Sequence, residues 1–267
     1  MIVYPNAKIN LGLNIHSKFE NGYHALQSIF IPIPLFDVLE IVETPNKTET
    51  QFSSTGISIP GKGNLCLDAY NLLKNDFDLP AVNIHLHKQI PIGAGLGGGS
   101  ADASFTLTTI NNMFNLNIDV HVLEQYAKLL GADCPFFIEN KPKFVEGIGE
   151  IMTPIEESPL KEMFLVLIFP EIHISTQEAY SGIRLTSKMD YNNIDFTQID
   201  SFKDLFKNDF EYHIFKKHNK LASVKEQLYK EGAFYASMSG SGSTMYGLFK
   251  EKPDLNQKFG LTKIIKL

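Results

Sequence analysis

The chain has 267 residues, of which 43% are hydrophobic and 20% are charged, and its formal net charge is −6. This length is enough for one large domain or two smaller ones with their own cores, so the composition excludes a chain that is disordered throughout. The negative net charge and the scattered Lys and Arg residues exclude a surface built to neutralise a nucleic-acid backbone, so no nucleic-acid partner is expected.

Secretory, membrane-spanning and disulfide-rich proteins also fit the sequence poorly. Polar residues such as Asn10 and Glu20 interrupt the first thirty positions, where a secretory signal would need a continuous apolar stretch. The apolar run at 163–169 is too short to cross a bilayer. We therefore expect a cytoplasmic protein with no membrane partner. Cys66 and Cys134 are too few for a disulfide framework or a paired-cysteine metal site, which predicts a structural role for both.

The N-terminal part of the chain is predicted to begin with strands. Apolar residues recur at short intervals between positions 2 and 15, and the Asn21-Gly22 pair that follows is a strong hairpin signal. A second strand is expected near 37–42, and the Ser, Thr and Gly residues of 53–58 predict a turn.

Helices and strands are then expected to alternate. Apolar spacing predicts a helix over 65–73, and an alternating pattern predicts a strand over 82–86. A glycine cluster lies between this strand and a helix with an apolar stripe at Ala103, Leu107, Ile110 and Phe114. Asp119 is the expected N-cap of the next helix, and Gly131 is its expected end.

The composition changes around 153–159, where two prolines, two glutamates and a serine separate Gly147-Ile148-Gly149 from the apolar segment at 163–169. We place a domain boundary there, which gives an N-terminal lobe of residues 1–157 and a C-terminal lobe of residues 158–267. The second lobe is predicted to contain a buried strand at 163–169, a helix near 221–229 and a last glycine cluster at 239–243.

The sequence PIGAGLGGGSAD at 91–102 carries the clearest functional signal. Glycines let a backbone approach a ligand closely, and the N–H groups at the start of the following helix attract anions, so we expect a phosphate site. A flexible turn is the structural alternative. Gly93, Gly95 and Gly98 match the dinucleotide pattern GxGxxG, but Asp119 opens a helix where that fold needs an acidic residue after a strand. The Walker pattern also fails, because no Lys-Ser or Lys-Thr follows the glycines.

Three segments together resemble the motifs of the GHMP family of small-molecule kinases: PNAKINL at 5–11, the glycine-rich loop, and MSGSGS at 238–243. The sequences NGYH at 21–24 and GADCPFF at 131–137 extend the resemblance to nearly the whole chain, and it is weakest between 180 and 207. It implies an α+β, two-lobed GHMP kinase fold. The N-terminal lobe should resemble ribosomal protein S5 domain 2 and bind ATP, and the C-terminal lobe should be ferredoxin-like.

Within that family the chain is similar to kinases that phosphorylate a hydroxyl of a cytidine diphosphate conjugate in the non-mevalonate route to isoprenoid precursors. This implies ATP and Mg²⁺ as cofactors, a small-molecule acceptor, and a monomer or homodimer. A sister kinase for homoserine, mevalonate or a sugar is an alternative, but it has no reason to keep the Tyr23-His24 pair together with Tyr180. A nucleotide-binding module without catalysis is a second alternative, which the presence of both Lys8 and Asp133 disfavours.

The resemblance implies that Asp133 is the catalytic base and that Lys8 lies beside both Asp133 and the reacting hydroxyl. From the residues alone, Asp133 is a turn or capping carboxylate and Lys8 is a solvated strand lysine. Asn10 follows Lys8 by one strand period, so the two side chains should share a face.

The resemblance also implies two sets of binding residues. For ATP they are Asn64, Pro91, Gly93, Ala94, Gly95, Leu96, Gly97, Gly98, Gly99, Ser100 and Ala101. For the acceptor they are Asn10, Tyr23, His24, Thr176, Tyr180, Gly240 and Gly242. Tyr23 and Tyr180 are expected to stack on the two faces of cytosine while His24 binds its edge.

Several of these assignments have structural alternatives. From the residues alone, Asn10 is an edge-strand asparagine and the Tyr23-His24 pair is surface or core filler. Asn64 lines the adenine pocket or caps the helix that follows it, and Ser100 caps the glycine-loop helix or approaches Mg²⁺. Gly240 and Gly242 approach phosphates or simply form a hairpin. His85 and His87 share a strand face, but because no third metal ligand is evident we expect them to be structural.

Overall fold

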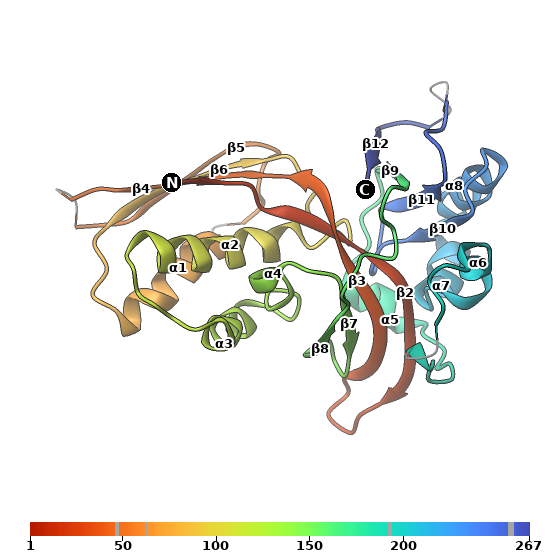
Figure 1. The fold of residues 1–267 in the computed structure, drawn as a ribbon, viewed down its shortest axis with the longest axis horizontal. Coiled ribbons are helices and arrows are strands. Elements are labelled where there is room, and N and C mark those ends of the chain that lie inside the picture. Colours follow the sequence, from red (N-terminus) through yellow and green to blue (C-terminus); the bar gives the residue numbers. More distant parts are fainter. Residues whose placement is uncertain (46–47, 62, 192–193, 256–258) are drawn as a thin grey trace. The chain divides into compact units, whose positions relative to one another are not determined.

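The computed structural model of the protein describes residues 1–45, 48–61, 63–191, 194–255 and 259–267 (Figure 1). Two compact units are formed from interleaved segments. Unit 1 consists of Met1–Ala7, Leu35–Ile92 and Gly97–Lys141, and unit 2 consists of Lys8–Pro34, Gly93–Leu96 and Pro142–Leu267. This division differs from the two lobes expected from the sequence, because most of the N-terminal hairpin belongs to unit 2. The lobe boundary at 157 stays a prediction.

The sheet of unit 1 has the strand order β1-β4-β6-β5. Its strands are β1 (Ile2–Val3), β4 (Val38–Glu43), β5 (Gln51–Gly56) and β6 (Val82–Lys88). Strand β5 runs parallel to β6, and the connection between them contains the helix that a parallel crossover requires. The turn expected at 53–58 is therefore wrong over 53–56, which belong to β5. As an edge strand with mostly exposed side chains, β5 carries polar residues instead of an alternating apolar pattern.

Helices lie on one side of this sheet, as Figure 1 shows. They are α1 (Leu65–Asp76), α2 (Gly98–Met113), α3 (Val120–Leu130) and α4 (Phe136–Glu139). Helices α1 and α2 are nearest to the sheet, and α3 and α4 pack against these two. The core between helices and sheet contains Leu39, Ile41, Ile84 and Leu86 from the strands and Leu73, Leu107, Ile110 and Leu123 from the helices. The predicted N-cap at Asp119 is confirmed, because its carboxylate accepts the N–H of His121.

The two strand histidines, His85 and His87, lie on the other face of the sheet and contact side chains of β5. His85 Nδ1 lies 2.9 Å from Ser53 Oγ, and His87 Nδ1 lies 2.9 Å from Thr55 Oγ1, so both rings help to hold β5 against β6. Within the described ranges, no group of three or more His, Cys, Asp or Glu side chains could hold a metal ion. These contacts support the structural role predicted for the pair.

The predicted N-terminal hairpin is confirmed. It consists of β2 (Asn6–Lys18) and β3 (His24–Phe36), and β3 continues into a sheet with β7 (Lys143–Glu146) and β8 (Ile151–Pro154). The turn closes through hydrogen bonds from Phe19 N to Tyr23 O and from Gly22 N to Phe19 O, with Gly22 in the left-handed region at φ +88°.

The second sheet of unit 2 is antiparallel, in the order β10-β11-β9-β12. Its strands are β9 (Phe164–Ile168), β10 (Tyr235–Met238), β11 (Met245–Phe249) and β12 (Thr262–Lys266). The helical segments of this unit are α5 (Thr176–Ser181), η2 (Ile199–Ser201), α6 (Phe202–Leu205), α7 (Phe210–Lys217) and α8 (Asn219–Lys230). The strand expected at 163–169 and the helix expected near 221–229 are confirmed.

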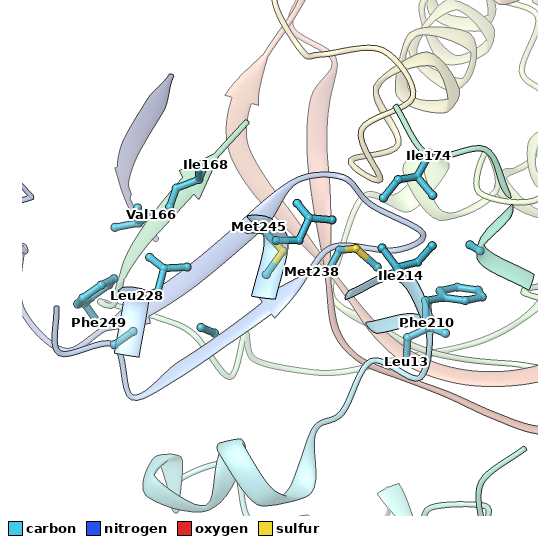
Figure 2. Packing of buried hydrophobic residues seen from close by; sticks show 14 of the residues in the cluster. Leu13, Val166, Ile168, Ile174, Phe210, Ile214, Leu228, Met238, Met245 and Phe249 are labelled. Carbon is cyan, nitrogen blue, oxygen red and sulfur yellow. The ribbon is translucent and has the colours of Figure 1, made fainter. Parts of the chain in front are cut away.

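Figure 2 shows the core of unit 2, where Val166, Met245 and Leu228 join the sheet to α8. Leu13 from β2 and Phe210 from α7 belong to the same cluster. In the part of the chain that the structure describes, no helix is long and apolar enough to cross a bilayer.

Candidate active site

The glycine-rich loop leaves β6 and enters α2, as the sequence predicts. The N-cap of α2 is Gly97, which adopts the left-handed conformation at φ +70° and ψ 14°, with no side-chain cap. The expectation that Ser100 caps this helix is wrong, because the glycine run itself turns the backbone and Ser100 lies inside the first turn.

The start of α2 fits a phosphate group. The first intrahelical bond joins Ala101 N to Gly97 O at 2.9 Å, so the preceding N–H groups point out of the helix end. A Cβ on Gly98 would lie 2.8 Å from Ile90 Cγ2 and 3.0 Å from Lys88 Nζ. Only glycine therefore lets the helix start this close to the end of β6.

In unit 2 the structure brings together the three sequence motifs. Lys8 N donates to Leu96 O at 2.9 Å, and Ser239 Oγ donates to Gly95 O at 2.8 Å. A Cβ on Gly95 would lie only 1.9 Å from Ser239 O. The first half of the glycine-rich loop thus contacts both the strand that carries Lys8 and the hairpin at 238–243.

Lys8 is a buried residue with polar partners. Its ammonium donates to Asn10 Oδ1 at 2.6 Å and lies 4.4 Å from the centroid of the Phe30 ring, and its side chain is only 3% exposed. Asn10 Nδ2 in turn donates to Ser28 Oγ at 3.0 Å. The shared face predicted for Lys8 and Asn10 is confirmed, and the alternative of a solvated strand lysine is wrong.

Asp133 lies in unit 1, on the half-buried turn between α3 and α4. The next residue, Cys134, is held to α2, since the Ser104 hydroxyl donates to Cys134 O at 2.6 Å. The turn that carries Asp133 is therefore fixed to α2, the helix that begins at the glycine-rich loop. Lys8 belongs to unit 2, and its pairing with Asp133 stays a prediction.

Two of the expected acceptor residues stack on each other. The rings of His24 and Tyr180 lie 5.0 Å apart at an interplanar angle of 28°, and Tyr180 packs edge-on against Phe210 at 4.9 Å. Burial, assisted by Lys18, lowers the pKa of His24. The Tyr23 side chain is 60% exposed. A base held between Tyr23 and Tyr180 stays a prediction.

The remaining acceptor residues lie on turns of unit 2. Thr176 is exposed at the start of α5. Gly240 and Gly242 form the hairpin between β10 and β11 with φ of +54° and +92°, so their structural alternative is confirmed and their contact with phosphates stays a prediction. The buried Asn208 donates to Met238 O at 2.7 Å and to Gly240 O at 2.8 Å, a support that no local sequence pattern predicts.

Asn64 is the N-cap of α1, where its side chain accepts the N–H of Cys66 at 2.8 Å. A Cβ on Gly99 would lie 3.6 Å from Leu65 Cδ1, so the first turns of α1 and α2 are neighbours. The capping alternative is confirmed, and contact with adenine stays a prediction. Sequence reasoning also missed the buried Lys88 at the end of β6, which pairs with Asp37 and Asp102. Its only signal in the sequence was a charged residue at the end of a strand with one buried face.

Comparisons with known proteins agree with this geometry. A model of the GHMP kinases N terminal domain matches residues 64–141, and a model of the GHMP kinases C terminal matches residues 197–259. A 4-diphosphocytidyl-2-C-methyl-D-erythritol kinase of Azobacteroides pseudotrichonymphae genomovar. CFP2 is 51% identical over 255 residues, with 94% of each chain covered.

Solved structures extend the comparison to the fold. The crystal structure of a 4-(cytidine 5'-diphospho)-2C-methyl-D-erythritol kinase matches with a TM-score of 0.85 and 28% identity, covering 99% of this chain and 98% of that one. A homoserine kinase from Cytophaga hutchinsonii matches with a TM-score of 0.75 and 13% identity, covering 100% of this chain and 94% of that one. The second match concerns the fold alone. The predicted α+β GHMP kinase fold is confirmed.

Proposed function

This chain belongs to the GHMP kinases, in the family of 4-diphosphocytidyl-2-C-methyl-D-erythritol kinases, and we propose that it phosphorylates the 2-hydroxyl of 4-diphosphocytidyl-2-C-methyl-D-erythritol. As a member of this family it is a small-molecule phosphotransferase that uses ATP. The observation that carries the proposal is the junction in unit 2, where Lys8, Gly95 and Ser239 bring the three motifs into contact.

The start of α2 is the proposed ATP phosphate site. Its outward N–H groups and the positive end of its dipole suit the triphosphate, and the neighbouring start of α1 at Asn64 is assigned to adenine. The Ser100 hydroxyl is assigned to Mg²⁺, which neutralises charge on the phosphates when bound.

Asp133 and Lys8 are the proposed catalytic residues. Asp133 accepts the proton of the acceptor 2-hydroxyl, and that oxygen forms a bond to the γ-phosphorus. The bond from this phosphorus to the β–γ bridging oxygen breaks, and ADP leaves. Lys8 stabilises the negative charge of the transferring group, since its ammonium is held in a buried position by Asn10 before the acceptor arrives.

The acceptor is proposed to bind through its cytosine. Tyr23 and Tyr180 stack on the base and His24 hydrogen-bonds its edge, while Asn10, Thr176, Gly240 and Gly242 contact the rest of the molecule. The support is that two of these residues lie together, since the His24 and Tyr180 rings are 5.0 Å apart and Phe210 packs edge-on against Tyr180. Because a homoserine kinase has the same fold, the acceptor must be decided by these side chains rather than by the architecture.

The catalytic assignment is tested with Asp133→Asn. The amide keeps the size of the side chain but cannot take the proton, so turnover should fall by roughly 10²–10⁴-fold. ATP should still raise the melting temperature as it does for the parent. Asp119→Asn is the matched control, because it makes the same change in the same unit at an N-cap where asparagine serves equally well. Near-parental turnover of Asp133→Asn would remove Asp133 from the mechanism.

The acceptor assignment is tested with a panel of substrates. A uracil edge leaves a hydrogen-bonding group of the site unpaired, so the uridine form of the acceptor should show a kcat/KM lower by roughly tenfold or more. His24→Ala should reduce this difference. Efficient phosphorylation of homoserine or mevalonate by the parent protein would contradict the acceptor while leaving the kinase assignment intact.

A further inference from the structure

Three titratable side chains are buried together at the end of β6 in unit 1, and burial raises the pKa of one of them, Asp102, to about 7. Lys88 Nζ lies 2.5 Å from Asp37 Oδ2 and 2.7 Å from Asp102 Oδ2. Lys88 and Asp102 are each 3% exposed and Asp37 is fully buried. Burial lowers the pKa of Lys88, but the two carboxylates outweigh it and raise this pKa overall, so the side chain stays an ammonium.

Such a cluster is poorly explained by stability alone. Removing charges from water costs free energy that their mutual attraction barely repays, and well-packed apolar residues of similar volume often stabilise a core at least as well. Buried ionic groups are better explained where they fix one particular arrangement of the backbone around them. The backbone groups next to this cluster therefore indicate its role.

Asp37 holds the backbone that leads into the glycine-rich loop. Its Oδ1 atom accepts the N–H of Gln89 at 2.5 Å and the N–H of Ile90 at 2.8 Å. These two residues directly precede Pro91, the first residue of the loop. Lys88 binds the other oxygen of the same carboxylate and so fixes its orientation.

Asp102 connects the cluster to the far end of the loop. It lies in the N-terminal part of α2, and its Oδ2 accepts a hydrogen bond from Lys88. The lysine also lies beside the first residue of the helix, since a Cβ added to Gly98 would be 3.0 Å from Lys88 Nζ. One ammonium thus contacts the groups that set both the start of the loop and the start of the helix.

We propose that Lys88, acting through Asp37 and Asp102, is a positioning residue that holds both ends of the glycine-rich loop in the conformation that binds ATP. This inference rests on the proposed function, in which the start of α2 binds the phosphates. The Lys88 ammonium binds Asp37 and Asp102, and it acts on ATP binding through these two residues. Its loss should therefore weaken ATP binding selectively, since a displacement of about 1 Å at a binding group can cost roughly 100-fold.

The test is Lys88→Met, which keeps an unbranched side chain of similar length without the charge. Binding of ATP is measured by calorimetry without acceptor, and KM is measured separately for ATP and for the acceptor. We expect the Kd and KM for ATP to rise by roughly 10- to 100-fold while the acceptor KM changes by less than about twofold. Leu73→Ala is the control, because it destabilises the core of the same unit on α1 and should leave the Kd for ATP unchanged.

Two milder variants keep the inference testable if Lys88→Met does not fold. Asp37→Asn retains an oxygen for the two loop N–H groups, and Asp102→Asn retains the shape of its side chain, but each weakens the link to Lys88. Each should raise the Kd for ATP by about three- to tenfold with a parental acceptor KM.

The outcomes separate this inference from the proposed function. Folded cluster variants with the parental Kd for ATP, or with equal changes in both KM values, would overturn the positioning role alone. A parent protein that binds no ATP would overturn the proposed function, and the inference with it.

Discussion

Replacement of Gly95 by alanine tests the contact between the glycine-rich loop and the hairpin at 238–243. Gly95 adopts φ +77°, where a side chain costs about 1–2 kcal/mol. Its new Cβ would lie 1.9 Å from Ser239 O and 2.9 Å from Ser239 C, which are backbone atoms that no rotamer change can remove. The two loops must therefore move apart by about 1 Å, at a further cost of about 1–3 kcal/mol.

The kinetic consequence follows from the same displacement. Gly95 lies in the loop assigned to the ATP phosphates, and a shift of about 1 Å predicts a loss of roughly 100-fold in kcat/KM for ATP. Thermal unfolding should show a loss of roughly 2–5 kcal/mol in the free energy of unfolding. Steady-state kinetics at saturating acceptor and thermal unfolding without ligands measure the two effects independently.

Gly232→Ala is the matched control within unit 2. Gly232 also has a positive φ, +95°, but a Cβ there would meet no atom within 4 Å. This variant should lose only about 1–2 kcal/mol and keep parental kinetics. The reasoning would be refuted if Gly95→Ala were no less stable than Gly232→Ala and retained the parental kcat/KM for ATP.

Two further predictions concern titratable groups. Burial raises the pKa of Cys134 to about 11 and raises that of Cys66 further. Both thiols should therefore react with a disulfide reagent at pH 8 far more slowly in the native protein than in urea. Equal rates would contradict their burial. Burial lowers the pKa of His24, so the ring is neutral near pH 7. Folded-state stability is lost as the pH falls below the ordinary pKa of histidine, and the folded ring gains its proton at the lowered pKa. The acceptor KM should therefore rise between pH 7 and pH 5 in the parent protein but not in His24→Gln, and the same rise in both would exclude His24 as its cause.

Strong local patterns predicted most of the elements that carry the site. The helix after the glycine run and the helix capped by Asp119 each follow from apolar spacing and a terminal residue, and both exist. Strand β5 was not predictable in the same way, because an exposed edge strand gains its stability from backbone pairing with β6 and needs no apolar pattern. The short helices α5, α6 and α7 likewise depend on packing in unit 2 more than on their own sequence.

The residues of the candidate site fall into two groups, those that local sequence patterns predict and those that depend on contacts between distant parts of the chain. The motif residues could be named from the sequence, since their chemistry and spacing are local. Their supports could not, because the partners of Lys88 lie 51 and 14 positions away along the chain and those of Asn208 lie 30 and 32 positions away. Nothing in a single sequence pairs a buried lysine with one distant carboxylate rather than another.

The glycines of the glycine-rich loop are required for different physical reasons. Gly95 must be glycine because the backbone of Ser239 lies where its Cβ would be. Gly97 is needed as a left-handed N-cap, and its conformation makes a serine cap at Ser100 unnecessary. Gly98 is needed because the helix begins against Ile90 and Lys88. The first requirement joins the loop to the hairpin, and the third joins it to the buried charges, so the same short segment depends on two separate parts of the chain.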